Sequence, residues 1–216
     1  LSVGRPPVFR IDGSLQNVDA PIIEARDTEA YVKGITADVY LQRIAEFGGV
    51  IYGFGYHRQV EDDLRKAVAQ NHASAKVMTS AGALIYGLKK LGAKKVSLLA
   101  PYMKPLTDRV VAYIEHEGIE VLDRICFEIP DNLEVGRRDP MRLLEDVKRL
   151  NIANADAVVL SACVQMQSLP AIQPAEKMLG LPVTSTSVCT ARNMLDLLEL
   201  EPRVPGCGAL LSLENP

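Results

Sequence analysis

The stretch AKVMTSAGALIYGLKKLGAKKVSLLAPYM (residues 75–103) decides the fold class of this chain. Residues 76–78 predict a short strand, and the Thr79–Ser80 pair that follows is typical of a helix start. The helical pattern runs to Leu91, and Gly92 predicts its end. The apolar run KKVSLLAPY then predicts a second, buried strand. This order of strand, helix and strand predicts parallel strands joined by a crossover helix.

The same alternation continues toward the C-terminus. Residues 107–130 predict a helix, a stop at Gly118 and a strand, and residues 140–150 predict the next helix. The segments DAVVLSAC, LPAIQPAEKMLG, LPVTSTS and ARNMLDLLEL, found between residues 156 and 200, predict strand, helix, strand and helix. Strands that alternate with such helices predict an α/β fold with parallel sheets and covering helices.

The residues before this region are less regular. VEDDLRKAVAQNH (residues 60–72) predicts an amphipathic helix, and GYHRQ (residues 55–59) predicts the loop that enters it. Residues 50–52 predict a short strand that ends at glycines. The first 45 residues contain turn-forming residues but no clear strand-and-helix unit.

Composition excludes several classes of protein. A chain of 216 residues with 48% hydrophobic and 24% charged residues has an ordinary globular composition, which excludes intrinsic disorder. Its formal net charge of −3 gives no basic footprint for nucleic acid. The apolar runs are far shorter than the ~20 residues that a membrane-spanning helix needs, and no signal segment opens the chain. We therefore expect no nucleic-acid or membrane partner and a cytoplasmic location.

The four cysteines are Cys126, Cys163, Cys189 and Cys207, and they form no CxxC pair. Only three histidines accompany them, so the sequence predicts neither a metal site nor a disulfide framework. Reduced thiols are typical of a cytoplasmic protein, which agrees with the expected location.

Polar side chains follow three of the predicted strands. Tyr102, Cys163 and Thr184–Ser187 lie at or just past strand ends, and parallel sheets bind ligands at the carboxyl ends of their strands. Two interpretations of Cys163 stay open: a buried residue at a strand end, or a thiolate stabilised by a helix that begins just after it. Tyr102 predicts either a hydrogen-bond donor to an anionic ligand or a residue that caps the core.

Two further positions are candidates for binding an anion. Thr79 and Ser80 offer hydroxyl groups and amides at a strand-to-helix junction, although an ordinary N-cap has the same sequence. Asn132, in PDN at residues 130–132, both donates and accepts hydrogen bonds, which suits a carboxylate, but PDN also suits a turn. From the residues alone, both interpretations of each position stay open. No GxGxxG or GxxxxGK[ST] motif is present, so a nucleotide site is not predicted.

The motifs TSAGAL, APYMKPLT, EIPDNLEVGR, DAVVLSACVQMQSLPAI and PRVPGCGALLS together resemble those of maleate cis-trans isomerases, in the aspartate/glutamate racemase superfamily. The resemblance extends from about Gly55 to the C-terminus. It implies two Rossmann-like α/β subdomains with parallel sheets, related by a pseudo-twofold axis, with the active site in the cleft between them. Residues 1–100 with about 190–216 would form the first subdomain, and residues 101–189 the second, which carries Cys163.

The resemblance also implies an activity and a set of site residues. The family isomerises maleate, a small dicarboxylate, to fumarate without a cofactor or metal, and its members are usually homo-oligomers. One cysteine adds to the double bond, so that the bond can rotate, and another cysteine moves a proton. By motif, Cys163 matches a catalytic cysteine of the family. The predicted substrate-binding residues are Tyr102 and Asn132, which match carboxylate-binding residues, together with Thr79, Ser80 and Val164.

Two departures from the family pattern affect the predicted mechanism. Counting back from Tyr56 places Ala45 where the family has its other cysteine, and no loop of the family's PSSNT type opens the chain. A single active-site cysteine resembles arylmalonate decarboxylase, which predicts decarboxylation or racemisation of malonate-type or amino diacids as an alternative. A dicarboxylate-binding protein without catalytic activity is a third alternative. The motif CVQMQSLP around Cys163 is that of the maleate isomerases, which places isomerisation first.

Overall fold

The computed structural model describes residues 8–9, 15–16, 56–70, 74–163 and 165–212 of the 216-residue chain. By internal contacts the chain divides into two units, residues 1–48 with 62–75 and residues 49–61 with 76–216, and each is described by itself. The predictions for Ala45, for residues 50–52 and for Val164 lie outside the described residues.

The first unit contains two short antiparallel strands, β1 (Val8–Phe9) and β2 (Leu15–Gln16). Helix α4 (Tyr56–Gln70) is continuous across the division, so residues 56–61 belong to the second unit and residues 62–70 to the first. All further described elements belong to the second unit, which therefore contains the region predicted to have an α/β fold.

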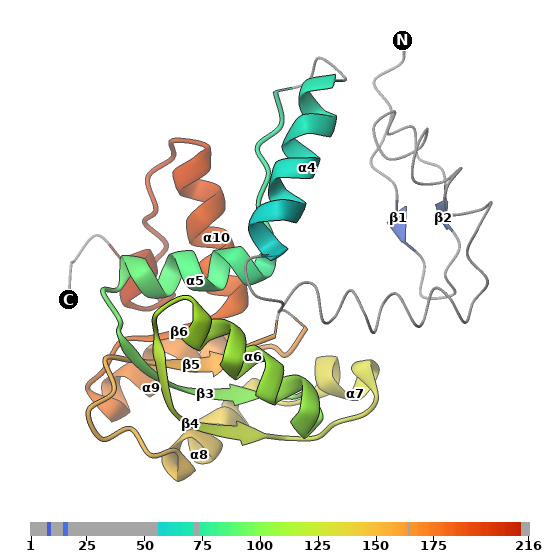
Figure 1. Cartoon of the computed structure of the whole chain (residues 1–216). Coiled ribbons are helices and arrows are strands. Elements are labelled where there is room, and N and C mark those ends of the chain that lie inside the picture. The colour runs from blue at the N-terminus through green and yellow to red at the C-terminus, as the bar shows by residue number, and fades with distance from the viewer. Residues whose placement is uncertain (1–7, 10–14, 17–55, 71–73, 164, 213–216) are drawn as a thin grey trace. The chain divides into compact units, whose positions relative to one another are not determined.

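Four parallel strands form the sheet of the second unit, in the order β4-β3-β5-β6 (Figure 1). They are β3 (Lys95–Ala100), β4 (Glu120–Cys126), β5 (Ala157–Ser161) and β6 (Val183–Ser185). The chain moves from β3 to β4 at one edge, returns past β3 to β5, and continues outward to β6. Because parallel crossovers are right-handed, this reversal places the helix of the β3–β4 crossover on one face and the helices of the next two crossovers on the other. The predicted parallel α/β sheet is confirmed.

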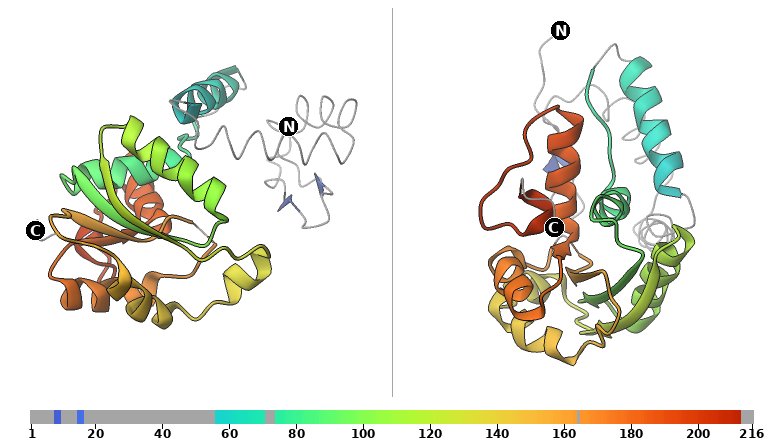
Figure 2. Two further views of the ribbon diagram at one scale, coloured as in Figure 1. Left: turned by 60° about the horizontal axis from the view of Figure 1, so that its bottom comes forward. Right: turned by 90° about the vertical axis from the view of Figure 1, so that its left-hand side faces the viewer.

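Helices cover both faces of the sheet (Figure 1; Figure 2). One face carries α5 (Ser80–Lys90), α6 (Lys104–His116) and α10 (Thr186–Leu197), and the other carries α8 (Leu143–Asp146) and α9 (Leu169–Leu179). Shorter segments are α7 (Asn132–Arg137), η1 (Pro140–Arg142), η2 (Val147–Arg149) and η3 (Ala209–Leu211). Because both faces are covered, β5 is buried along its whole length and shows no polar alternation.

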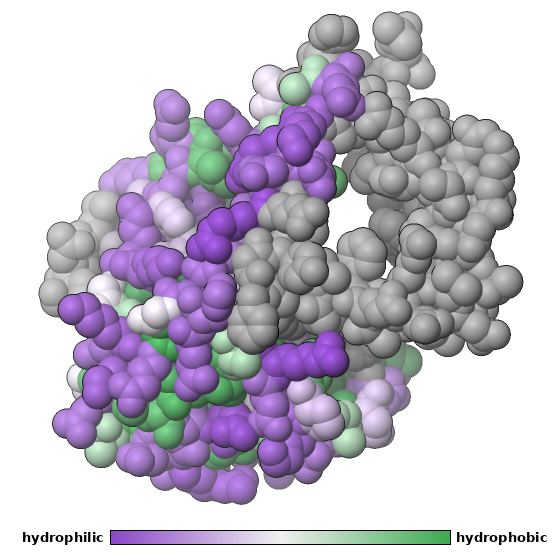
Figure 3. Space-filling view, viewed as in Figure 1, coloured by the Kyte–Doolittle hydropathy of each residue, from purple (hydrophilic) through white to green (hydrophobic). Residues whose placement is uncertain are grey.

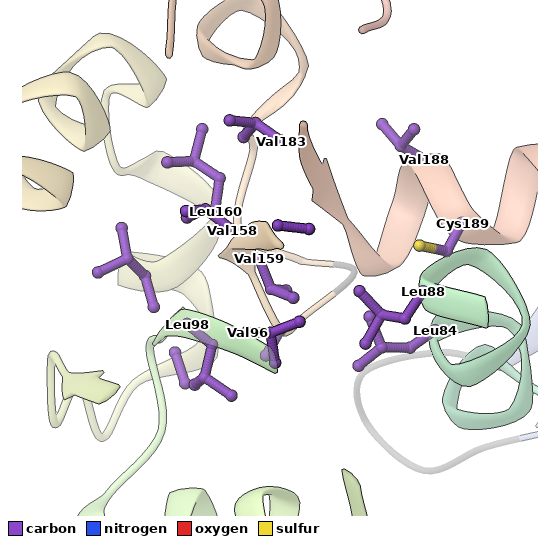
Figure 4. Close-up of a cluster of buried hydrophobic side chains, with 14 of the residues drawn as sticks. Leu84, Leu88, Val96, Leu98, Val158, Val159, Leu160, Val183, Val188 and Cys189 are labelled. Atoms are coloured by element: carbon purple, nitrogen blue, oxygen red, sulfur yellow. The ribbon is translucent and has the colours of Figure 1, made fainter. Parts of the chain in front are cut away.

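The core joins the sheet to α5 and α10 (Figure 4). Leu84 and Leu88 of α5 and Val188 of α10 face the buried valines and leucines of the strands. Hydrophilic side chains dominate the described surface in the view of Figure 3, as expected for amphipathic covering helices. Among the described helices, none is both long enough and apolar enough to cross a membrane.

The boundaries of the helix in residues 75–103 are confirmed. Thr79 is the N-cap of α5, and its hydroxyl oxygen accepts a hydrogen bond from the Gly82 N–H at 3.0 Å. Gly92 follows the C-cap with φ of +70°, a left-handed conformation that glycine adopts without steric cost. The predicted strand at residues 76–78 is wrong, since this segment is irregular and the Thr79 N–H bonds to the Glu61 carboxylate at 2.8 Å.

Three other predicted boundaries are corrected. The predicted loop over residues 55–59 is wrong from Tyr56 onward, because α4 begins there. The helix predicted from residue 191 begins at Thr186, because the Ser185 hydroxyl accepts the Val188 N–H and caps it. The single helix predicted over residues 140–150 is three short segments, η1, α8 and η2.

The predicted subdomain boundary at residue 100 lies inside the second unit. It follows β3 directly, and β3 is hydrogen-bonded to β4 on one side and β5 on the other. Residues 95–100 therefore share a sheet with residues that the prediction assigned to the second subdomain.

Candidate active site

Cys163 lies two residues beyond β5, at the carboxyl end of this buried strand. The Ala162 N–H extends the strand pairing by donating to the Leu99 carbonyl at 2.9 Å. The Ser161 hydroxyl donates to the Cys163 carbonyl at 2.8 Å, and the Ser161 carbonyl accepts from the Thr186 hydroxyl at 3.3 Å. These bonds tie the backbone around Cys163 to β3 and to the start of α10.

The Cys163 sulfur is buried and has a defined hydrogen-bond donor. The side chain is 2% exposed, and the Gln165 N–H donates to Sγ at 3.3 Å. A helix does not begin directly after Cys163, since α9 starts at Leu169. Among the described residues, the donor to the sulfur is therefore the Gln165 backbone N–H, placed where negative charge on the sulfur would develop.

Tyr102 lies two residues beyond β3, at the same edge of the sheet as Cys163. Its side chain is half-buried and packs against the core, and its carbonyl accepts from the Thr107 hydroxyl at 3.4 Å. Tyr102 thus contacts the core, as one interpretation expects, and it lies at the carboxyl edge of the sheet, where parallel α/β folds bind ligands. Its hydrogen bond to an anionic ligand stays a prediction.

Asn132 is the first residue of α7, with Asp131 as N-cap, so the PDN segment starts a helix. The chain reaches it from β4, and the Phe127 and Ile129 N–H groups donate to the Ala100 and Pro101 carbonyls, each at 2.9 Å. The segments that carry Tyr102 and Asn132 therefore leave the sheet side by side.

The α7 helix also contacts the loop after Cys163. The Gln167 side-chain amide donates to the Gly136 carbonyl at 3.2 Å. Three predicted site segments, around Tyr102, Asn132 and Cys163, thus meet at the carboxyl edge of one sheet, where α/β folds bind ligands.

Thr79 and Ser80 begin α5, and Thr79 serves as its cap. The Glu61 Oε1 atom accepts from the Thr79 N–H and from the Thr79 hydroxyl, both at 2.8 Å. The hydroxyl oxygen also accepts from the Gly82 N–H, so a carboxylate of the protein itself occupies the Thr79 end of this helix. Ser80 is half-buried beside it.

A buried polar pair that the sequence does not indicate lies next to this cap. His57 Nδ1 and the Tyr113 hydroxyl are 2.9 Å apart, and both residues are buried. Burial and the neighbouring Arg58 guanidinium lower the pKa of His57. Arg58 in turn is ion-paired with Glu117, and this pair raises the pKa of Arg58. These contacts hold the first turn of α4 against α6.

The other three cysteines lie elsewhere in the second unit. Cys189 lies in α10 with its sulfur 3.3 Å from the Thr184 hydroxyl, and burial raises the pKa of its thiol to about 12. Burial also raises the pKa of Cys207. Cys126 ends β4 and is partly exposed. Among the described residues, no group of three His, Cys, Asp or Glu side chains is placed to hold a metal ion.

Comparison with known proteins agrees with the motif resemblance. The maleate isomerase of Geobacillus stearothermophilus is 59% identical over 160 residues, which are 74% of this chain and 64% of that protein. A maleate isomerase from Pseudomonas putida, a cysteine-to-alanine variant solved with maleate, superposes with a TM-score of 0.74 at 48% identity, covering 76% of this chain and 66% of that one.

A third relative is a maleate cis-trans isomerase from Nocardia farcinica. The structure is of a cysteine-to-serine mutant with a covalently bound succinylcysteine intermediate, with a TM-score of 0.75, 39% identity, and coverage of 77% of this chain and 69% of that one. The chain spans just under two thirds of the length of the curated maleate isomerase that it matches.

A family model described as arylmalonate decarboxylase matches residues 49–211, which include every described site residue. The buried thiol of Cys163, just after β5, lies inside this match. The sequence match, the parallel α/β sheet and the solved relatives together show that the chain belongs to the arylmalonate decarboxylase family, within which its resemblance is to the maleate isomerases.

Proposed function

We propose that this protein isomerises maleate to fumarate without a cofactor, with Cys163 as the catalytic thiol. One observation carries the proposal: Cys163 is held at the carboxyl end of β5, an interior strand of the sheet, with a backbone N–H donated to its sulfur. The residues that match the family's carboxylate binders stand at the same edge of the sheet. The identity to maleate isomerases supports the choice of substrate.

The chemistry requires a covalent step, because rotation about a carbon–carbon double bond is slow until that bond becomes single. The Cys163 S–H adds across the alkene: sulfur bonds to one carbon, and a proton is delivered to the other. The product is a succinyl thioether, whose central carbon–carbon bond rotates freely. Elimination then removes a proton, breaks the carbon–sulfur bond and restores the thiol, with no net redox change.

The Nocardia farcinica structure supports an adduct of this kind. Its succinylcysteine is the saturated thioether that addition of a thiol to maleate produces. The adduct is present although one cysteine has been replaced by serine, so a different cysteine of that protein carries it. Relatives thus have at least two relevant thiols, and the count from Tyr56 in this chain places Ala45 at the second position.

The remaining substrate contacts follow from the same edge of the sheet. We assign Tyr102 and Asn132 to the carboxylates of the substrate, because both segments border the Cys163 loop. Val164 follows Cys163 directly, and Ser80 and Thr79 begin α5. The Glu61 carboxylate already accepts a hydrogen bond from the Thr79 hydroxyl. Thr79 therefore contributes to substrate binding by fixing the start of α5 more than through its own hydroxyl.

A second candidate function follows if Cys163 is the one cysteine of the active site. The family model is named for arylmalonate decarboxylase, and one thiol is enough to protonate a carbanion after carbon dioxide leaves. Decarboxylation or racemisation of a malonate-type or amino diacid is therefore the alternative reaction. Binding of a dicarboxylate without turnover is the outcome that would place the chain outside both enzyme classes.

The test compares three proteins by proton NMR, which resolves the alkene protons of maleate and fumarate. The wild-type chain should form fumarate, and Cys163→Ala should show only the uncatalysed rate. Cys126→Ala is the matched control, because Cys126 ends the edge strand β4, which β3 separates from β5, and the variant should keep full activity. Equal turnover by wild type and Cys163→Ala would remove Cys163 from the mechanism. Carbon dioxide release from substituted malonates, with maleate unchanged, would favour the decarboxylase.

We also propose that the protein is a cytoplasmic homo-oligomer. All four of its cysteines are free thiols, which supports a reducing compartment. Light scattering coupled to gel filtration tests the oligomeric state, and cell fractionation tests the location.

A further inference from the structure

Helix α7 is short and contributes little to the core. It has six residues, Asn132–Arg137, of which Val135 is buried, whereas Leu133 is half exposed. Isolated helices of this length are unstable in water, so contacts outside the helix must fix its position. Because α7 begins with Asn132, those contacts also fix the backbone position of this predicted substrate-binding residue.

Gln167 links α7 to the catalytic loop. Its side-chain amide donates to the carbonyl of Gly136, one of the last carbonyls of α7 that lack a partner within the helix. Gln167 lies four residues after Cys163, in the loop between β5 and α9. One hydrogen bond therefore connects the segment that carries the thiol with the helix that carries Asn132.

Arg138 also anchors the C-terminal end of α7. It is the C-cap residue, and its guanidinium carbon lies 4.2 Å from the centroid of the Phe127 ring, just after β4. The guanidinium is also ion-paired with Asp146 at the end of α8, and the two side chains are only 14% and 17% exposed. Cation–π stacking and a shielded ion pair are both stronger away from water than at an exposed surface.

We propose that Gln167 and Arg138 are positioning residues: together they hold α7 at a fixed distance from the Cys163 loop, so that Asn132 and Cys163 engage the same dicarboxylate. Arg138 fixes α7 to the sheet and to α8, and Gln167 fixes the Cys163 loop to α7. Neither residue touches the reacting atoms in this scheme. The inference rests on the proposed dicarboxylate function of the site, and it predicts a specific defect in ligand binding.

The test uses the full chain and three variants. Gln167→Leu removes the bond to Gly136 at an exposed position, where folding should be unaffected. Arg138→Lys keeps the charge but loses the planar group that stacks on Phe127. Gln173→Leu is the matched control, an exposed glutamine in α9 that lies outside the loop.

Gln167→Leu and Arg138→Lys should raise KM for maleate by about fivefold, which corresponds to one hydrogen bond, with little change in kcat. In an Asn132→Ala background, neither substitution should raise KM further, because both act through the position of α7. Gln173→Leu should behave as wild type. Additive effects in the double variants, or an unchanged KM in Gln167→Leu, would overturn the proposal.

A readout independent of turnover separates this proposal from the proposed isomerisation. The dissociation constant of succinate, an unreactive dicarboxylate, is measured by isothermal titration calorimetry. A Kd about fivefold higher in Gln167→Leu than in the wild type supports the coupling even if maleate is not isomerised. Absence of succinate binding by the wild type overturns the coupling, because no dicarboxylate then joins the two segments.

Discussion

Replacing Gly87 by alanine tests how closely α5 and α10 pack. A Cβ atom at Gly87 would lie 2.4 Å from the Cys189 sulfur, 2.8 Å from the Cys189 Cβ and 3.0 Å from Leu210 Cδ2. Carbon atoms in good contact are ~3.5–4.0 Å apart, so the added methyl group stands roughly 1 Å too close. The two helices must therefore separate, or α10 must rotate, before the methyl group fits.

Two opposing effects set the size of the change. Overpacking a core costs about 1–3 kcal/mol, and the upper end applies because Cys189 and Leu210 are both buried. Alanine is the better helix former by about 1 kcal/mol. The net loss is about 2 kcal/mol of unfolding free energy, which for a domain of this size lowers Tm by about 4–8 °C.

Thermal unfolding followed by circular dichroism measures the effect, with Gly136→Ala as the matched control. Gly136 is also helical, but nothing lies within 4 Å of its added Cβ, so only the helix-forming gain remains. Cys189→Ala in the Gly87→Ala background removes the nearest atom, so the double variant should be more stable than the sum of the two single effects. A Tm for Gly87→Ala at or above the wild-type value would refute the close packing of α5 on α10.

Three further predictions concern the titrating groups and the thiols. The pKa of His57 is lowered in the folded state, so its contribution to stability is present above the unfolded value of 6.5 and is lost as pH falls below it. Urea titrations of the wild type should show that the free energy of unfolding falls with pH in this range. A His57→Gln variant whose free energy of unfolding fell equally steeply with pH would contradict this prediction. Ala45→Cys should raise the rate of fumarate formation by about a hundredfold, since a positioned proton donor contributes at least that much, and a rise no larger than that of Ala45→Ser would show that this position does not face the substrate. Native Cys189, buried and with its pKa raised to about 12, should resist iodoacetamide at neutral pH while partly exposed Cys126 reacts, and peptide mass mapping that finds Cys189 modified first would disprove its burial.

Local patterns in the sequence predicted most of the second unit. The start of α5 at Thr79, its end before Gly92 and the buried strand β5 follow from capping, glycine conformation and hydrophobic runs, all of which act within a few residues. The length of β6 was overestimated, because a run of Ser and Thr suits both a strand end and a helix cap, and the Ser185 hydroxyl decides in favour of the cap.

Contacts between distant residues were beyond the reach of local patterns. The first turn of α4 is helical because His57 meets Tyr113, 56 positions away, and because Arg58 meets Glu117. The carboxylate at the start of α5 comes from Glu61, so the sequence suggested an anion site where the protein supplies the anion itself. No local sequence pattern predicts which distant residue a glutamate or a histidine contacts.

The hydrogen bond between Gln167 and Gly136 is likewise a contact between distant residues, 31 positions apart, that local patterns do not predict. The sequence placed Asn132 and Cys163 in one site only through family motifs, whereas the structure supplies a direct link between their segments. The motif CVQMQSLP thus contains both a thiol and the residue that ties its loop to α7, and only the thiol was recognisable by its chemistry.

The convergence of the Tyr102, Asn132 and Cys163 segments on one sheet has an evolutionary consequence. All three segments lie between β3 and α9, so one contiguous stretch of the gene encodes them. Recombination outside this stretch therefore leaves the three segments together. A lineage can therefore conserve this thiol-bearing half while the residues that complete the centre drift or are replaced. An acid or base supplied from outside this stretch would then change the reaction without altering the thiol.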